Sequence, residues 1–365
     1  MGEEGEELGT LTYVIRDGWL QAFESTIPYE KDAGEELWKS TFKAAGRRDT
    51  LSQVRGSFGV FELGSKLKVA DCSTRFANLS SKVRLAKWVR GLVEPPIPVC
   101  PQSGWLRWDY DMSTPELGSE FLLDMKQNGT TYVMKKDGAS GGSGIYFVNS
   151  IAQVERIVLE GIDLEEALPF LDERRDAIAD WAVQRHIDSP MLLLGGHKFH
   201  LRAFVVHVDN RVFFYDTYEV RIAPLKWTMD FEDRNCHITN GGGSEAHHER
   251  RFLAKDFELE LGNICRTKVP EFLHYVLANA QSPESSEDLQ PGWLPASVMG
   301  LDIMVDTTGR LHLLEANHSM AAPPVDEMTE FGCHVRQLCR RIVRQIVAAP
   351  LGHIVPGFQE VFYQT

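Results

Sequence analysis

Two apolar runs near the C-terminal end of this chain, each carrying polar residues, constrain its fold more than any other feature. They are Met299–Asp306 and Leu311–Asn317, and a glycine-containing turn separates them. Asp302 lies inside the first run, while Glu315 and Asn317 stand two positions apart in the second and share one face of a strand. We expect a β-hairpin that gathers oxygen ligands of the kind Mg²⁺ prefers, with nucleotide phosphates completing its shell. The alternative is that these are strand-end residues facing water.

Composition narrows the class of protein. The chain has 365 residues, 43% hydrophobic and 25% charged, which is ordinary for a globular protein of two or three lobes. Its net charge of -14 argues against generic nucleic-acid binding, although a local basic cleft stays open. No apolar stretch approaches the roughly 20 residues of a membrane span. The six cysteines are scattered without a Cys-x-x-Cys pair, which favours reduced thiols in a cytoplasmic protein.

Periodicity and chain breakers divide the sequence into three parts. We expect an N-terminal α/β lobe over residues 1–100, a central lobe over 101–190 and a C-terminal lobe over 191–365. Pro95–Pro98 breaks the chain near the first boundary and leads into a Trp-containing stretch, Gly104–Trp108, which we expect to be a loop. The expected helices cover Glu35–Ala45, Ser80–Leu92, Ile151–Leu159, Leu164–Ala177 and Glu330–Val347.

A glycine-rich segment, Gly138–Gly144, lies between two expected strands, Thr131–Met134 and Ile145–Val148. A phosphate-binding loop of the Walker or dinucleotide type would be followed by a helix. Here the glycines occupy a hairpin tip, which indicates a flap whose backbone N–H groups close over phosphates, with Lys135 at its base. A plain flexible loop is the alternative.

A basic stripe follows on the expected strand Lys198–Arg202. Because side chains alternate along a strand, Lys198, His200 and Arg202 share one face and could bind an anion. Arg221, after the next strand, could join the same cleft, since guanidinium groups suit carboxylates and phosphates. A solvated strand face is the alternative. Adjacent histidines at 247 and 248 do not have zinc-site spacing.

Two further segments are candidate parts of the same binding site. Gln184–Ile187 has the look of a hinge against which adenine could lie, although a structural strand is equally open. Cys236–Asn240 places hydroxyl and amide groups just before a triple glycine.

Taken in order, these segments resemble the tubulin–tyrosine ligase family within the ATP-grasp superfamily. The resemblance covers about residues 131–322 and rests on pieces in the family's order and approximate spacing. The pieces are Lys198–Arg202, Val220–Ala223, Cys236–Asn240, Asp302 and Glu315–Asn317.

The resemblance implies an α/β (α+β) ATP-grasp fold, with ATP held between the central and C-terminal lobes under the flap. It assigns the catalytic role of steadying phosphates and acyl phosphate to Arg202 and Arg221. It assigns Mg²⁺ binding to Asp302, Glu315 and Asn317. The residues it places around ATP are Lys135, Gln184, Arg185, Ile187, Lys198, His200, Thr239, Asn240 and Leu314.

The implied reaction is ATP- and Mg²⁺-dependent amide formation between an amino acid and a protein tail through an acyl phosphate. Such chemistry needs positioning and charge neutralisation more than a covalent nucleophile. The implied acceptor is an acidic tail, most simply that of tubulin, in the cytoplasm or on the cytoskeleton, and the compact chain favours tyrosination over glutamylation. A local basic groove would have to receive that tail, and Lys82, Lys87 and Arg90 on one expected helix are candidates beside the two arginines.

The chain departs from the family pattern at three positions. Gly141 stands where the flap usually has a basic residue, His200 where an aspartate is usual, and His318 where a small residue is usual. Each lost contact to a charged group could cost about 1–3 kcal/mol. A non-catalytic module that binds tubulin or another protein is therefore the main alternative to an active ligase. A ligase of small-molecule metabolism is a third.

Overall fold

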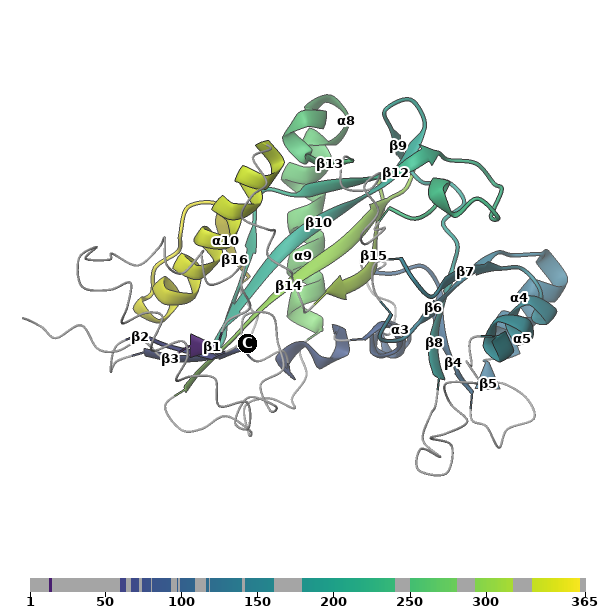
Figure 1. Ribbon diagram of the computed structural model, residues 1–365, viewed down its shortest axis with the longest axis horizontal. Coiled ribbons are helices and arrows are strands. Elements are labelled where there is room, and N and C mark those ends of the chain that lie inside the picture. The colour runs from purple at the N-terminus through teal and green to yellow at the C-terminus, as the bar shows by residue number, and fades with distance from the viewer. Residues whose placement is uncertain are drawn as a thin grey trace, which may run out of the picture.

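The computed structural model describes most of the chain from residue 60 onward, together with a short strand before it. The described residues are 13–14, 60–63, 67–71, 74–79, 81–92, 97, 99–108, 116–117, 119–139, 142–160, 179–239, 250–280, 293–317 and 330–361. The helices expected over Glu35–Ala45 and Leu164–Ala177 lie outside them. Within the described residues the chain forms two β-sheets flanked by helices, so the expected α/β class is confirmed (Figure 1).

The smaller sheet has five strands in the order β5-β4-β8-β6-β7. Its strands are β4 (Ser103–Trp108), β5 (Glu116–Leu117), β6 (Tyr132–Lys136), β7 (Ile145–Val148) and β8 (Ala179–Arg185). All its pairings are antiparallel, and β6 and β7 form the expected glycine-tipped hairpin. The loop expected over Gly104–Trp108 was wrong: this stretch belongs to β4, because it pairs with β8 along its whole length.

The larger sheet has eleven strands and runs diagonally across Figure 1, with β10 and β14 at its centre. Its strands are β1 (Tyr13–Val14), β2 (Val60–Leu63), β3 (Leu67–Asp71), β9 (Leu192–Leu193), β10 (His197–Val208), β11 (Arg211–Tyr215), β12 (Glu219–Lys226), β13 (Arg251–Leu253), β14 (Trp293–Val305), β15 (Leu311–Asn317) and β16 (Phe358–Val361). The parallel pairing of β3 with β14 extends this sheet with strands from the N-terminal part of the chain. The lobe boundaries at residues 100 and 190 remain predictions.

The helices expected over Ser80–Leu92, Ile151–Leu159 and Glu330–Val347 are present, and three further described helices were not predicted. The described helices are α3 (Lys82–Gly91), α4 (Ser119–Asn128), α5 (Ile151–Glu160), α8 (Glu258–Asn263), α9 (Val269–Asn279) and α10 (Glu330–Ala348). The shorter helical segments are η2 (Thr74–Leu79), η4 (Arg234–Cys236), η5 (Ala254–Phe257), η6 (Ile264–Lys268) and η7 (Ala349–Leu351). None of the described helices is long and apolar enough to cross a lipid bilayer.

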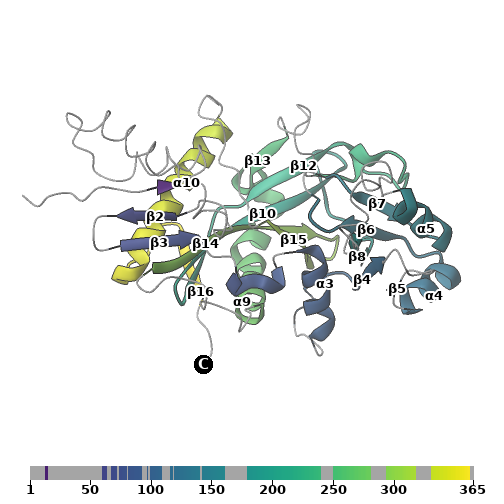
Figure 2. The same ribbon diagram turned by 60° about the horizontal axis from the view of Figure 1, so that its bottom comes forward.

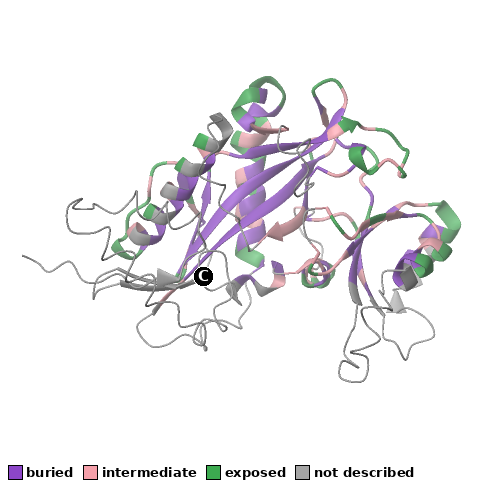
Figure 3. Cartoon of the chain, viewed as in Figure 1, coloured by how far each residue is buried: buried purple, intermediate pink, exposed green. Residues whose placement is uncertain are grey.

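Alternation along β10 explains how one strand serves both core and site. Phe199, Leu201 and Val205 point to the face covered by α9 and join its apolar residues in the main core. Helix α10 lies on the opposite face, as the turned view shows (Figure 2). Figure 3 shows β10 buried along its length and β14 buried from Ala296 onward, so the polar residues on the second face of β10 are enclosed as well.

The expected hairpin of β14 and β15 is confirmed, and it contains a β-bulge. Asp302 pairs with Glu315, whereas Ile303 pairs with Leu313, so Leu314 is the extra residue. The bulge shifts the register by one, which places Glu315 beside Asp302 rather than on the face of Leu313. At the other end, Oδ1 of Asp306 accepts hydrogen bonds from the backbone N–H groups of Thr308 at 2.8 Å and Arg310 at 3.0 Å, so the turn is firmly capped.

Packing between β4 and α4 gives a test of this fold. A Cβ added at Gly104 would lie 2.5 Å from the Phe121 ring, so we expect Gly104→Ala to lower the free energy of unfolding by about 1–3 kcal/mol through overpacking. Gly91, at the end of α3, has open space around its Cβ position, so Gly91→Ala is the matched control and should lose no stability. Urea unfolding of both variants decides the matter, and equal midpoints would contradict this packing.

Candidate functional site

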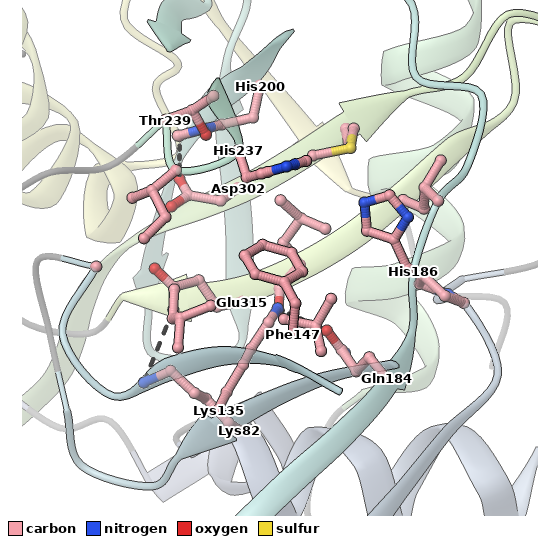
Figure 4. A pocket seen from close by; sticks show the side chains of 18 of the residues that line it. Lys82, Lys135, Phe147, Gln184, His186, His200, His237, Thr239, Asp302 and Glu315 are labelled. Atoms are coloured by element: carbon pink, nitrogen blue, oxygen red, sulfur yellow. Dashed lines mark hydrogen bonds and ion pairs between the residues drawn. The ribbon is translucent and has the colours of Figure 1, made fainter. Parts of the chain in front are cut away.

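A pocket lies between the two sheets, beneath the glycine-rich hairpin. One side comes from the hairpin strands and the end of β8, and the other from β10, β14 and β15 (Figure 4). Ten of the residues expected to form the site line it. They are Lys135, Gln184, Arg185, Ile187, Lys198, His200, Thr239, Asp302, Leu314 and Glu315.

Asp302 is the most enclosed acidic group of the pocket, with 2% of its surface exposed. Arg202 faces it across the β10–β14 ladder and donates from Nε and from one terminal nitrogen to its two carboxylate oxygens, each at 2.6 Å. Burial alone would raise the pKa of the Asp302 carboxyl, but the charges and hydrogen bonds of Arg202 and His200 hold it well below its usual range. Asp302 therefore stays ionised inside the protein.

Glu315 and Asn317 extend this acidic centre from β15. The side-chain amide of Asn317 donates to Asp302 Oδ2 at 3.3 Å and to Glu315 Oε1 at 3.2 Å. Lys82, at the start of α3, lies with its ammonium 3.8 Å from Glu315 Oε2 (Figure 4). The sequence had indicated Lys82 only as part of a basic helix face, so its place in the pocket is a finding of the structure.

Two buried lysines line the same pocket as the acidic centre. Lys135 Nζ donates to Gln184 Oε1 at 2.6 Å and to the carbonyl oxygen of Leu314 at 3.1 Å, which the bulge leaves outside the strand ladder. Burial lowers the pKa of Lys135. Burial and the charge of Lys135 lower the pKa of Lys198 to about 8. Two ammonium groups held out of water favour an anionic ligand, because an anion would offset the desolvation of both.

His200 and Thr239 form the wall next to Asp302. His200 Nδ1 and Thr239 Oγ1 are 2.6 Å apart, and His200 Nε2 lies 3.4 Å from Asp302 Oδ1. Burial lowers the pKa of His200, although Asp302 opposes the shift. The imidazole is thus enclosed between the Thr239 hydroxyl and the Asp302 carboxylate.

An aromatic cluster lines the pocket beside the end of β8. Phe147 and His237 have ring centroids 4.7 Å apart, and Phe231 stacks on both at 5.2 and 5.0 Å. His186 meets Phe231 edge-on at 5.0 Å. Burial, followed by the charge of Lys198, lowers the pKa of His186 to about 4, so this ring is uncharged near neutral pH and adds to the aromatic surface of the wall.

Four predicted site residues are not in the lining. Arg202 lies behind Asp302, and Asn317 reaches the pocket only through the two carboxylates. Arg221 donates to Glu219 Oε2 at 3.0 Å, and burial with the charge of Arg202 lowers its pKa to about 10. Asn240 lies outside the described residues, as do Gly141 and His318.

Sequence reasoning missed several lining residues that an alternation argument could have found. Val133, Phe147 and Met304 stand two positions from lining residues on their own strands and share their face.

The donor set fits a Mg²⁺ ion that a nucleotide helps to bind. The described residues contain no group of three or more His, Cys, Asp or Glu side chains arranged to hold a metal. They do provide two carboxylates on neighbouring strands with an amide beside them. Mg²⁺ typically takes one or two protein carboxylates and completes its shell with phosphates and water.

Comparison with known proteins places this geometry in context. A family model described as "Tubulin-tyrosine ligase family" matches residues 109–360. The chain is 23% identical over 256 residues to "Probable alpha-tubulin polyglutamylase Ttll1" of Tetrahymena thermophila. The match covers 61% of this chain and 57% of that relative, so the chain spans little more than half of the relative's length.

The lowered pKa of Lys198 predicts a pH dependence for the binding of ATP, the nucleotide that the family resemblance implies. Phosphates favour the charged lysine, which is populated below a pH of about 8 and lost above it. We expect ATP affinity to fall as pH rises past that value, by up to about tenfold per pH unit, with proton uptake on binding. Calorimetry of the native chain and of Lys198→Met measures both quantities. If ATP affinity depended on pH equally in the two proteins, Lys198 would not be the group that binds phosphate in its charged form.

Proposed function

The chain belongs to the tubulin-tyrosine ligase family, and from that premise we propose that it is an ATP- and Mg²⁺-dependent ligase joining an amino acid to a protein tail. The observation that carries the proposal is the meeting of two carboxylates and two buried lysines in one pocket between the sheets. The lining has four cationic side chains, Lys82, Lys135, Arg185 and Lys198, against two carboxylates, in a protein of net charge -14. This local excess of positive charge suits a polyphosphate ligand.

The residues divide into a base-binding end and a phosphate-binding end. Gln184, Arg185 and Ile187, with His186 beside them, would line the adenine, supported by the uncharged rings next to them. Lys135 and Lys198 would neutralise phosphates. Thr239 and Leu314 would complete the walls, the second by positioning Lys135 through its carbonyl oxygen.

Asp302, Glu315 and Asn317 would hold Mg²⁺ together with the phosphates. The ion, when bound, supplies charge neutralisation and orients the phosphate chain. Arg202 keeps Asp302 ionised and fixes its orientation. Lys82 would have to release Glu315 from its ion pair, or share it, when the metal binds.

The proposed reaction starts with transfer of the γ-phosphoryl group to a carboxylate, and an amine then displaces phosphate to form the amide. For this chemistry the chain would supply alignment and positive charge rather than a nucleophile. Arg221 and Arg202 lie behind the acidic centre, where they would stabilise negative charge that develops on the transferred group. His200, held by Thr239, would supply a positioning hydrogen bond near Asp302.

The relative's name makes glutamate the first amino acid to test beside tyrosine, and α-tubulin the first acceptor. An acidic acceptor tail would find Lys87 and Arg90 on the exposed side of α3, where both cations lie over the Trp105 ring. A cytoplasmic or cytoskeletal location agrees with such an acceptor.

A second function, a ligase-like module that binds tubulin or another protein without catalysis, is favoured by one observation. Both carboxylates of the acidic centre are already paired with cations of the chain, Asp302 with Arg202 and Glu315 with Lys82. Binding of nucleotide and metal distinguishes the two functions.

We expect micromolar ATP binding that requires Mg²⁺ in the native chain. Glu315→Gln removes one carboxylate at constant size, so affinity should fall at least about tenfold, or 1.4 kcal/mol. Calorimetry with and without Mg²⁺ measures this, and unfolding curves check that the variant is folded. Binding in neither protein would favour the non-catalytic module.

Lys135→Ala should abolish ATP-dependent amide formation, because it removes a buried phosphate-neutralising charge and leaves Gln184 and Leu314 without their donor. Transfer of radiolabelled glutamate or tyrosine to purified tubulin is the assay. The exposed Lys126→Ala variant on α4 is the control and should keep full activity. Full activity in Lys135→Ala would show that the site is wrongly assigned.

A further inference from the structure

The hairpin over the pocket carries no charge of its own at its tip. Between Gly138 and Ile145 every residue is Gly, Ala or Ser. Gly138, Gly142 and Gly144 have positive φ angles of 75°, 79° and 65°, so the tip follows a path that other residues adopt poorly. The described part of the tip is held from within by backbone hydrogen bonds, from Lys136 N–H to Gly144 O at 2.8 Å and from Ala139 N–H to Lys136 O at 3.4 Å.

Two cations from different parts of the chain bind the backbone carbonyls on the two sides of this tip. Lys82 Nζ, from α3, donates to the carbonyl oxygen of Ala139 at 2.6 Å. Arg234, from η4, donates through a terminal nitrogen to the carbonyl oxygen of Gly142 at 2.7 Å. The backbone N–H of Lys82 also donates to Asp137 Oδ1 at 2.9 Å, which fixes the hairpin against the start of α3.

A second set of contacts joins the same two segments on the Arg234 side. Phe147, at the end of the hairpin's returning strand, contacts Phe231 and His237, which flank η4 in sequence. These rings bury apolar surface next to the Arg234 hydrogen bond. The hairpin is thus attached to the larger sheet's side of the pocket by both a charged and an apolar contact.

We propose that Arg234 is a positioning residue that holds the glycine-rich hairpin closed over the phosphate end of the pocket, with Lys82 holding its other side. The inference rests on the proposed nucleotide site and extends it to a residue outside the lining. Arg234 also brings positive charge to the hairpin tip from another segment, where the tip itself has none. A closed hairpin keeps water from a reactive acyl phosphate and aligns backbone N–H groups with the phosphates.

Hydrogen exchange of the nucleotide-free protein tests the attachment directly. Arg234→Ala should speed exchange of amides in residues 136–147 about tenfold, the change typical of one lost charge-assisted hydrogen bond. Arg234→Lys, which keeps a cationic donor, should recover most of the protection. Asn235→Ala, the exposed neighbour, should leave exchange unchanged. Unchanged exchange in Arg234→Ala would overturn the proposal.

Ligand binding separates positioning from a merely structural role. In Arg234→Ala the dissociation constant for Mg²⁺-ATP should rise about five- to tenfold, while that for adenosine, which has no phosphates, should stay the same. Faster hairpin exchange with an unchanged ATP-to-adenosine ratio would overturn the positioning role. If the native chain binds no ATP, the proposed function fails, yet the exchange comparison still decides whether Arg234 holds the hairpin.

Discussion

The buried pair of Arg202 and Asp302 is the interaction on which the pocket depends. It joins the two central strands of the larger sheet with two short hydrogen bonds and keeps a carboxylate ionised in an enclosed place. Gly300 lies beside this pair. A Cβ at its position would be only 3.2 Å from the Arg202 side chain, so a larger residue would crowd it. Removing one partner would leave an uncompensated buried charge, which typically costs about 3–5 kcal/mol. The same two side chains therefore join β10 to β14 and hold the buried charge of Asp302.

The rest of the pocket surrounds the Arg202–Asp302 pair with an excess of positive charge. Burial lowers the pKa of both Lys135 and Lys198, and the charge of Lys135 lowers that of Lys198 further. Such an arrangement reduces the stability of the free protein and increases its affinity for an anion, since the ligand offsets both penalties. Lys82 adds positive charge to the pocket from a segment far away in sequence, and its ammonium also donates to the hairpin backbone at Ala139. One side chain thus contributes both to the charge of the pocket and to the position of the hairpin.

Much of the fold and many of the site residues could be predicted from the sequence, because the signals were local. Alternation predicted the β14–β15 hairpin and the shared face of Lys198 and His200, and both are present. Glycine spacing predicted the β6–β7 tip. Helical stripes predicted α3, α5 and α10. Gly104–Trp108 was predicted wrongly, because its strand character comes from pairing with β8 rather than from its own composition.

The sequence by itself determined which residues could carry the chemistry: their types, their spacing and the face each shares on its strand. Only the tertiary structure decided how they meet. The bulge at Leu314 turns Glu315 toward Asp302 and frees a carbonyl oxygen for Lys135. The packing of α3 brings Lys82 to Glu315. The strand register directs Arg202 to Asp302 rather than into the open pocket. These outcomes depend on register and on contacts between segments distant in the chain, which local periodicity does not encode.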